Sequence, residues 1–351
     1  MGLFPPARPH FDAALRDVQA RSPGARTLAA HSLGAPPPGR ETEAKEGLRR
    51  LADDTHAEVR VAALSALGAL RDAGAIELVL ARVEYGDPTV RQVALLAAGD
   101  IGGEQASQYM LQAVADPRPD VRFQAAGALA QLAPEGAAAA LRRRARLEED
   151  PEVRARLADA LGALEDAGSA DALAALLEDA TAGVRQAAAI ALARVGDARG
   201  ARELVPALSD RERGFEAAWA LGEIGAREAI EPIASLAARL TQPLPFRAAL
   251  GAALVRLGDP RGALVLRKVL RAWRADGRSY AAELVGELGA LELAGDLCEL
   301  ADRPRGADPI VVAAALGKLA ARSPEARAAL ERMAARGGDA ALAAKEALDV
   351  A

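Results

Sequence analysis

The hydrophobic positions of this chain recur in a pattern about 31 residues long. Each clear copy has Asp, a short gap, Val-Arg, and then Ala and Leu at fixed offsets, as in DPEVRARLADALG from Asp150. Five copies align on a Val, with separations of 31, 31, 32 and 31 residues. A regular period of this length is the sequence signature of a repeat architecture. Weaker copies extend the series to eleven anchor positions, at residues 25, 59, 90, 121, 153, 184, 213, 246, 277, 308 and 340.

Each copy predicts two helices. After the anchor Val184, apolar residues stand at offsets +4, +7 and +8, which share one face of an α-helix. Gly196 ends this helix, and the turn GDARG leads to a second helical segment, ARELVPALSD. Alternation with period two is absent, which argues against strands. The pattern therefore predicts an all-α fold, a right-handed α-solenoid of about eleven two-helix repeats.

We expect residues 1–351 to form a single solenoid, because each repeat in such a fold contacts only its neighbours and chain length is not limited by one core. The longest gap between anchors, from 25 to 59, contains a proline-rich insertion at 35–41. This insertion either lets the first repeat, residues 1–34, move or is a simple loop, and the sequence leaves both open.

Composition agrees with closely packed helices. Hydrophobic residues make up 51% of the chain but aromatic residues only 3%, and Ala, the best helix former, supplies much of the apolar content. The single cysteine, Cys298, excludes an intramolecular disulfide. We expect a cytoplasmic protein, because neither a secretory signal nor an apolar run of about 18 residues is present. Abundant Ala, Arg, Gly and Pro suggest a GC-rich bacterial source.

The recurring Asp, Val-Arg, Ala-Ala and Leu-Gly, seen in DPEVRARLADALG and AAWALGEIG, resemble the HEAT-repeat superfamily. The resemblance is to its short-repeat branch, named after the phycobilisome-lyase HEAT-like repeats, and it covers about residues 10–350. It implies the solenoid fold. It does not select a function, because the matching residues are structural and the branch includes bilin-lyase subunits, scaffolds and regulators.

The Asp and Arg of the motif form a series that could be a row of acid or cation sites. The favoured interpretation is structural: each Asp caps a helix, and each Arg pairs with acids of its own or the adjacent repeat. The resemblance implies that this arrangement ties repeats together. The series comprises Asp54 and Arg60, Asp87 and Arg91, Asp116 and Arg122, Asp150 and Arg154, and Asp179 and Arg185.

The sequence contains no convincing catalytic or metal-binding arrangement. His10, His31 and His56 lack metal-site spacing. Cys298 has no nearby His, and we expect it to be a buried structural residue. We therefore expect no enzymatic activity, no catalytic residues, no metal and no cofactor.

One segment, residues 261–278, is markedly basic and could contact an acidic partner or a phosphate backbone. A nucleic-acid partner is nevertheless disfavoured, because the chain carries a net charge of −5 with a pI of about 5.5. The basic residues that we single out are Arg267, Lys268, Arg271, Arg274 and Arg278.

An exposed apolar surface is expected on the second helices, which line the concave side of HEAT-type folds. If offsets 0, +4, +7 and +8 face the core, offsets +2 and +6 lie nearly opposite. Exposed apolar surface usually marks an interaction site, and Trp is a favoured anchor. A shifted register or strong curvature would instead bury these residues between repeats, and self-association is a third alternative. The predicted partner-binding residues are Val61, Leu96, Phe123, Ile190, Phe215 and Trp219.

These observations favour a protein-interaction scaffold or adaptor that binds a protein or peptide on its concave surface and performs no chemistry of its own. The alternative is a bilin-lyase-like subunit or chaperone that helps attach a chromophore to a partner protein. A helical-repeat nucleic-acid-binding protein is a third, less favoured possibility. The oligomeric state is not fixed by the sequence.

Overall fold

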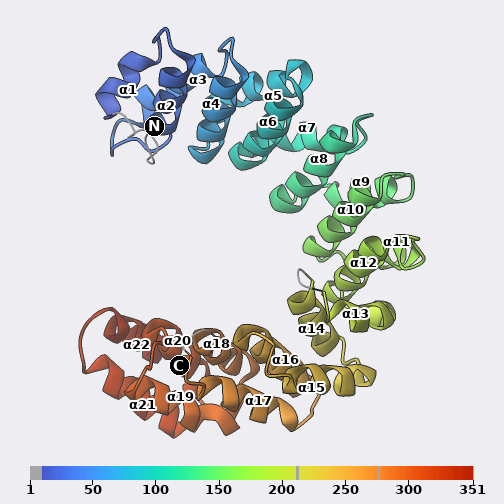
Figure 1. Cartoon of the computed structure of the whole chain (residues 1–351), viewed down its shortest axis with the longest axis vertical. Helices are drawn as coiled ribbons and strands as arrows, with labels where there is room; N and C mark the ends of the chain where they lie inside the picture. The colour runs from blue at the N-terminus through green and yellow to red at the C-terminus, as the bar shows by residue number, and fades with distance from the viewer. Residues whose placement is uncertain (1–9, 211–212, 275–276, 351) are drawn as a thin grey trace. The chain divides into compact units, whose positions relative to one another are not determined.

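The computed structural model describes residues 10–210, 213–274 and 277–350. The chain divides into two compact units, unit 1 (Met1–Ala172) and unit 2 (Leu173–Ala351). All of the regular structure in the described residues is helical (Figure 1). Each unit is therefore built only from helices packed on helices.

The helices of unit 1 are short, as expected for two-helix repeats. A 3₁₀ turn precedes some of the first helices, and α11 contains the boundary between the units. In chain order they are α1 (Phe11–Asp17), α2 (Pro23–Leu33), α3 (Glu41–Leu51), α4 (Ala57–Ala69), η1 (Ala73–Ala75), α5 (Ile76–Tyr85), α6 (Pro88–Ile101), α7 (Gly103–Ala113), α8 (Pro119–Leu132), α9 (Ala137–Ala145), α10 (Pro151–Ala163), η2 (Ala167–Ser169) and α11 (Ala170–Leu176).

Unit 2 continues the same alternation. Its elements are α12 (Ala182–Arg194), η3 (Ala198–Gly200), α13 (Ala201–Ala207), α14 (Gly214–Glu223), η4 (Arg227–Ala229), α15 (Ile230–Ala238), α16 (Leu244–Arg256), α17 (Arg261–Leu270), α18 (Arg278–Leu288), η5 (Leu291–Leu293), α19 (Ala294–Asp302), α20 (Pro309–Ala320), α21 (Pro324–Ala334) and α22 (Asp339–Val350).

The 22 α-helices of the described residues form eleven pairs, and every predicted anchor lies in or immediately before the second helix of a pair. In unit 1, α4, α6, α8 and α10 pack side by side, and in unit 2 α14, α16, α18, α20 and α22 do the same (Figure 1). In each unit the first helices of the repeats form a second row, which packs against the row of second helices. The predicted α-solenoid of two-helix repeats is confirmed.

Small residues allow the second helices to approach closely. A Cβ added at Gly286 in α18 would lie 2.7 Å from the Cα of Ala315 in α20. A Cβ added at Gly68 in α4 would likewise lie only 2.9 Å from the Cα of Ala97 in α6. Buried leucines, such as Leu64 and Leu95 in unit 1, fill the space between the two rows. The low aromatic content of the chain follows from this close packing.

Only some of the motif aspartates cap helices as predicted. Asp87 accepts hydrogen bonds from the backbone of Thr89 and Val90, and a Pro occupies the first position of α6. Asp150 caps α10 in the same way. The expectation is wrong for Asp54, Asp116 and Asp179, because the N-cap residue of each of their helices lies two positions later. Each of these carboxylates instead accepts a hydrogen bond from the backbone N–H of that later residue. The Asp54 carboxylate also accepts hydrogen bonds from the Arg26 guanidinium.

Charged side chains add to the apolar packing of the first repeat on the second, in which Leu33 of α2 lies against Gly47 of α3. Arg40, at the end of the proline-rich insertion, makes ion pairs with Asp12 and Glu43 and lies 4.5 Å from the centre of the Phe11 ring. Arg26 of α2 pairs with Asp54 at 2.5 Å. The single-domain prediction and the mobility of the first repeat remain predictions.

Among the described residues, no helix is both long enough and apolar enough to span a bilayer.

Candidate partner-binding surface

The motif arginines bind the backbone of the turn that precedes their own helix. One guanidinium nitrogen of Arg60 donates to the carbonyls of Asp54 and Thr55, six and five residues earlier. Arg122 donates to Asp116 and Pro117, and Arg185 donates to Asp179 and Ala180. Since turn carbonyls otherwise lack helical partners, the motif arginine closes the turn between the two helices of a repeat. Arg154 makes the same pair of contacts, with Glu148 and Glu149.

The same arginines reach acids of the following repeat. Arg60 pairs with Asp87 at 3.2 Å, and Arg91 pairs with Asp120 at 3.3 Å. Arg122 pairs with Glu148, whose side chain is fully buried and also accepts a hydrogen bond from Arg144. The arginines therefore link neighbouring repeats within unit 1. This is the geometry that the structural interpretation of the series requires.

Burial opposes ionisation of Glu148, but the hydrogen bonds from Arg122 and Arg144 and from the Asp150 backbone outweigh it. Together they lower the pKa of Glu148 to about 2. The Arg26 guanidinium has the same effect on Asp54, whose pKa is also lowered to about 2. Both carboxylates are charged at neutral pH and are occupied by structural partners.

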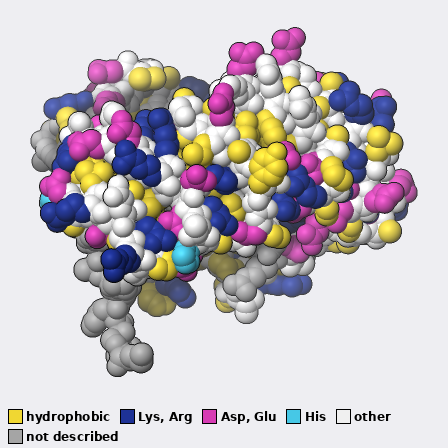
Figure 2. All heavy atoms as spheres, turned by 90° about the horizontal axis from the view of Figure 1, so that it is seen from above, with side chains coloured by type: hydrophobic (Ala, Val, Ile, Leu, Met, Phe, Trp, Pro, Cys, Tyr) yellow, Lys and Arg dark blue, Asp and Glu magenta, His cyan; other side chains and the backbone are white. Residues whose placement is uncertain are grey.

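The predicted basic patch is wrong for one of its five residues. Arg278 is 2% exposed and donates to the carbonyl of Ala272, six residues earlier, so it is the motif arginine of its own repeat. Arg267 and Arg271 both bind the buried carboxylate of Asp296, at 3.0 and 2.7 Å. Lys268, Arg271 and Arg274 are nevertheless exposed. Positive and negative side chains are interspersed across the face that Figure 2 shows.

The three predicted contact residues of unit 1 are partly or fully accessible. Leu96 in α6 is 51% exposed, whereas Val61 and Phe123 are half-buried. The Arg156 guanidinium lies 5.3 Å from the centre of the Phe123 ring. Phe123 lines a polar pocket of about 490 Å³, which includes the carboxylates of Asp120 and Asp150.

The three predicted contact residues of unit 2 range from buried to exposed. Ile190 is 2% exposed, so its predicted place on the surface is wrong: it belongs to the hydrophobic cluster between α12 and α14. Trp219 is half-buried against the same cluster. Phe215 is 40% exposed, although its ring packs 5.0 Å from Phe246 and 6.4 Å from Tyr280, centre to centre.

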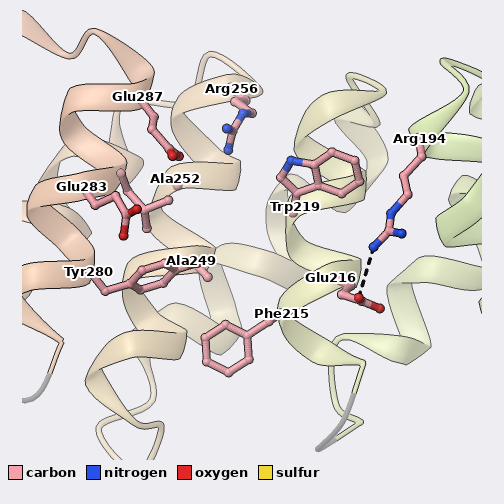
Figure 3. A pocket seen from close by; sticks show the side chains of 11 residues that line it. Arg194, Phe215, Glu216, Trp219, Ala249, Ala252, Arg256, Tyr280, Glu283 and Glu287 are labelled. Atoms are coloured by element: carbon pink, nitrogen blue, oxygen red, sulfur yellow. Dashed lines mark hydrogen bonds and ion pairs between the residues drawn. The ribbon is translucent and has the colours of Figure 1, made fainter. Parts of the chain in front are cut away.

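Phe215 and Trp219 line one pocket of about 410 Å³, shown in Figure 3. Their helix, α14, forms one wall. Ala249 and Ala252 of α16 form a floor of small side chains, and Tyr280 of α18 lies opposite Phe215. We call this the aromatic pocket. Its remaining lining residues are Arg194, Glu216, Arg256, Glu283, Leu284 and Glu287.

The aromatic pocket has a charged rim. Glu216 pairs with Arg194 at 3.2 Å, the interaction drawn in Figure 3, and Arg256 pairs with Glu223 at 3.4 Å. Glu283 and Glu287 are exposed on α18, and no ion pair joins either of them to another described residue. Burial raises the pKa of the Tyr280 hydroxyl, and the two carboxylates raise it further.

Sequence reasoning missed Tyr280, because it stands at offset +3 and only offsets +2 and +6 were taken as outward. The available signal was that an aromatic residue, Tyr280, stands near the start of a second helix in the repeat directly after the one that contains Phe246. Trp273, in the turn after α17, is 90% exposed and was also missed. Turn residues carry no helical periodicity, so the pattern could not place it.

Cys298 is half-buried, and its thiol donates to the carbonyl of Glu325 at 3.5 Å. Burial raises the pKa of this thiol, so it is protonated at neutral pH. Within the part of the chain that the structure describes, no three His, Cys, Asp or Glu side chains are grouped to hold a metal ion.

Residues 79–150 and 144–215 match the family model for HEAT repeats, and residues 215–239 match the model for the PBS lyase HEAT-like repeat. Residues 79–239 therefore consist of HEAT-like repeats. The second match begins at Phe215 and includes Trp219. No curated protein gives a significant match to the chain.

Solved structures resemble this HEAT-repeat protein in fold. The complex of CpcE and CpcF of phycocyanin lyase from Nostoc sp. PCC7120 is 22% identical, with a TM-score of 0.49, over 71% of this chain and 95% of that chain. A structure of Kap95p bound to RanGDP is 13% identical, with a TM-score of 0.52, over 96% of this chain and 57% of that chain. At 13% identity, the similarity to Kap95p shows the fold alone.

The expectation that this HEAT-repeat protein is not an enzyme is contradicted by the match of residues 215–239 to the PBS lyase HEAT-like repeat. The search for catalytic side chains could not find this relation, because it lies in the repeat itself; the family resemblance had suggested a bilin-lyase-like subunit as the alternative function.

Proposed function

We propose that this HEAT-repeat protein is a scaffold that binds a segment of a partner protein on the second-helix face of unit 2, the face expected to be concave. The aromatic pocket is the centre of the proposed site. The observation that carries the proposal is the exposed ring of Phe215, which shares a pocket with Trp219 and Tyr280.

Packing alone does not account for the aromatic pocket. An aromatic side chain that only joined repeats would be buried, since burial is the source of its stabilising energy. Phe215 instead remains 40% exposed while most of its small neighbours, including Ala217 and Ala249, are buried. A pocket of about 410 Å³ is within the size range of ligand sites and has room for one or two large side chains. A side chain of a partner inserted into the pocket would cover the exposed part of the Phe215 ring.

Affinity capture from a lysate of the source organism, read by mass spectrometry, tests this proposal. The baits are the wild type, Phe215→Ala/Trp219→Ala, and the control Leu264→Ala, which removes an exposed apolar side chain from the first helix α17. Melting temperatures of all three are measured first. We expect a partner that the wild type and the control capture and the double variant loses.

Two results would contradict the proposal. Capture of the same partner by all three baits would place binding elsewhere on the chain. A double variant whose melting temperature falls by ten degrees or more, as expected for loss of a core aromatic costing about 3–5 kcal/mol, would make the two rings structural.

The second candidate is a lyase-like role acting on a chromophore. The observation that favours it is the overlap of the PBS lyase HEAT-like repeat match with Phe215 and Trp219. Its test is titration of the chain with a linear tetrapyrrole, followed by visible absorption. A saturable spectral change that Phe215→Ala/Trp219→Ala abolishes would support this role, and an unchanged spectrum would exclude chromophore binding at the aromatic pocket.

A further inference from the structure

We infer that the segment bound in the aromatic pocket is cationic, with a Lys or Arg next to a large apolar side chain. This inference rests on the proposed function and specifies the chemistry of the partner. It follows from the placement of the rim carboxylates relative to the aromatic rings.

The rim contains more carboxylates than its arginines can neutralise. Arg194 is occupied by Glu216, and Arg256 is occupied by Glu223. Glu283 and Glu287 are left without an ion pair among the described residues, and both point toward the pocket (Figure 3). A cationic side chain entering the pocket would meet two carboxylates that have no other partner.

Glu283 and Glu287 stand four residues apart on α18, one helical turn, so their like charges repel each other. Both carboxylates also act on the pocket wall: they raise the pKa of the Tyr280 hydroxyl beyond the effect of burial, and Arg256 opposes them with a smaller effect. A bound cation would relieve this repulsion. An acidic segment or a phosphate would increase it.

The aromatic rings suit the rest of such a side chain. Lys and Arg bury their aliphatic stems on apolar surface while the charged end reaches a polar rim. Phe215, Trp219 and Tyr280 supply that surface, and a cation over a Trp or Tyr face gains further attraction. An adjacent Leu or Phe of the partner would fill the space above Ala249 and Ala252.

Tryptophan fluorescence with two designed peptides tests the inference. The chain has two Trp, so Trp273→Phe leaves Trp219 as the only reporter. The probes are an 18-residue amphipathic Leu/Lys helix and the same peptide with Glu in place of every Lys. The Glu283→Gln/Glu287→Gln variant removes the rim charges, and Glu325→Gln/Glu331→Gln on α21 makes the same change of net charge elsewhere.

We expect the Leu/Lys peptide to shift the Trp219 emission saturably and the Leu/Glu peptide to leave it unchanged. The rim variant should weaken binding of the Leu/Lys peptide about fivefold, as expected for two exposed ion pairs, and the α21 variant should not. Equal binding of both peptides would overturn the inference but leave the proposed function standing. Equal weakening by both variants would also overturn it, because binding would then follow net charge. Failure of both peptides to affect Trp219 would overturn the inference and count against the proposed function as well.

Discussion

Glu148 is the residue on which several contacts of unit 1 converge. Its buried carboxylate accepts hydrogen bonds from Arg122 of α8, Arg144 of α9 and the backbone of Asp150. Removing one partner of a buried ion pair leaves the other charge uncompensated. We expect Glu148→Ala to lower the free energy of unfolding by about 3 kcal/mol, measured by urea denaturation.

The matched control is Glu299→Gln, which breaks an exposed pair with Arg305. It should change the free energy of unfolding by less than about 0.5 kcal/mol. A similar loss in the two variants would contradict a special role for Glu148.

The lowered pKa of Glu148 also predicts a pH dependence. A carboxylate with a folded pKa of about 2 and an unfolded pKa of about 4.3 stabilises the protein above pH 4.3. This contribution is lost as the pH falls from about 4.5 to about 2. We expect denaturant titrations to show a smaller acid-induced loss for Glu148→Gln than for the wild type across this window, and equal losses would refute the assignment.

Arg278 shows why a basic segment is not always a binding surface. The side chain is buried on the carbonyl of Ala272, where it holds the turn before α18. We expect Arg278→Ala to cost about 2 kcal/mol of unfolding free energy, because it removes the charge-assisted hydrogen bonds of a buried guanidinium. Lys268→Ala, at an exposed position on α17, should be nearly neutral by thermal denaturation.

At the scale of the element, helix contacts depend on glycines that leave no room for a Cβ. We expect Gly286→Ala to be destabilising, because its Cβ would clash with the α20 backbone at Ala315. Gly183→Ala is the control: no atom lies within 4 Å of its Cβ, and it sits in the first turn of α12. Since Ala is a better helix former, Gly183→Ala should raise the melting temperature slightly. If Gly286→Ala also raised it, the close contact of α18 and α20 would be wrong.

The second helices could be predicted almost completely from the 31-residue period, because each anchor begins a helix whose apolar face recurs. The period could not predict whether a particular side chain is exposed or buried. Ile190 stands at the offset opposite the core face, yet it is buried in a hydrophobic cluster that also contains residues of α14. Helical periodicity describes one helix and contains no information about how tightly the next second helix packs. The same limit explains why Tyr280, at a neighbouring offset, was not recognised as part of the pocket.

At the scale of the whole molecule, a solenoid should respond locally to damage, because repeats contact only their neighbours. We expect Gly286→Ala to increase hydrogen exchange in α18, α20 and α22 while leaving α4, α6 and α8 unchanged. Hydrogen exchange with mass spectrometry resolves these segments. Faster exchange throughout the chain would instead indicate a single cooperative fold.

The aromatic pocket is the place where we expect a partner to bind the molecule. Site-specific photo-cross-linking tests this most directly, with p-benzoylphenylalanine replacing Phe215 in one protein and Leu264 on α17 in another. Illumination in lysate should give a cross-linked partner from position 215 and none from position 264. Cross-linking from position 264 alone, or equally from both, would contradict the central claim.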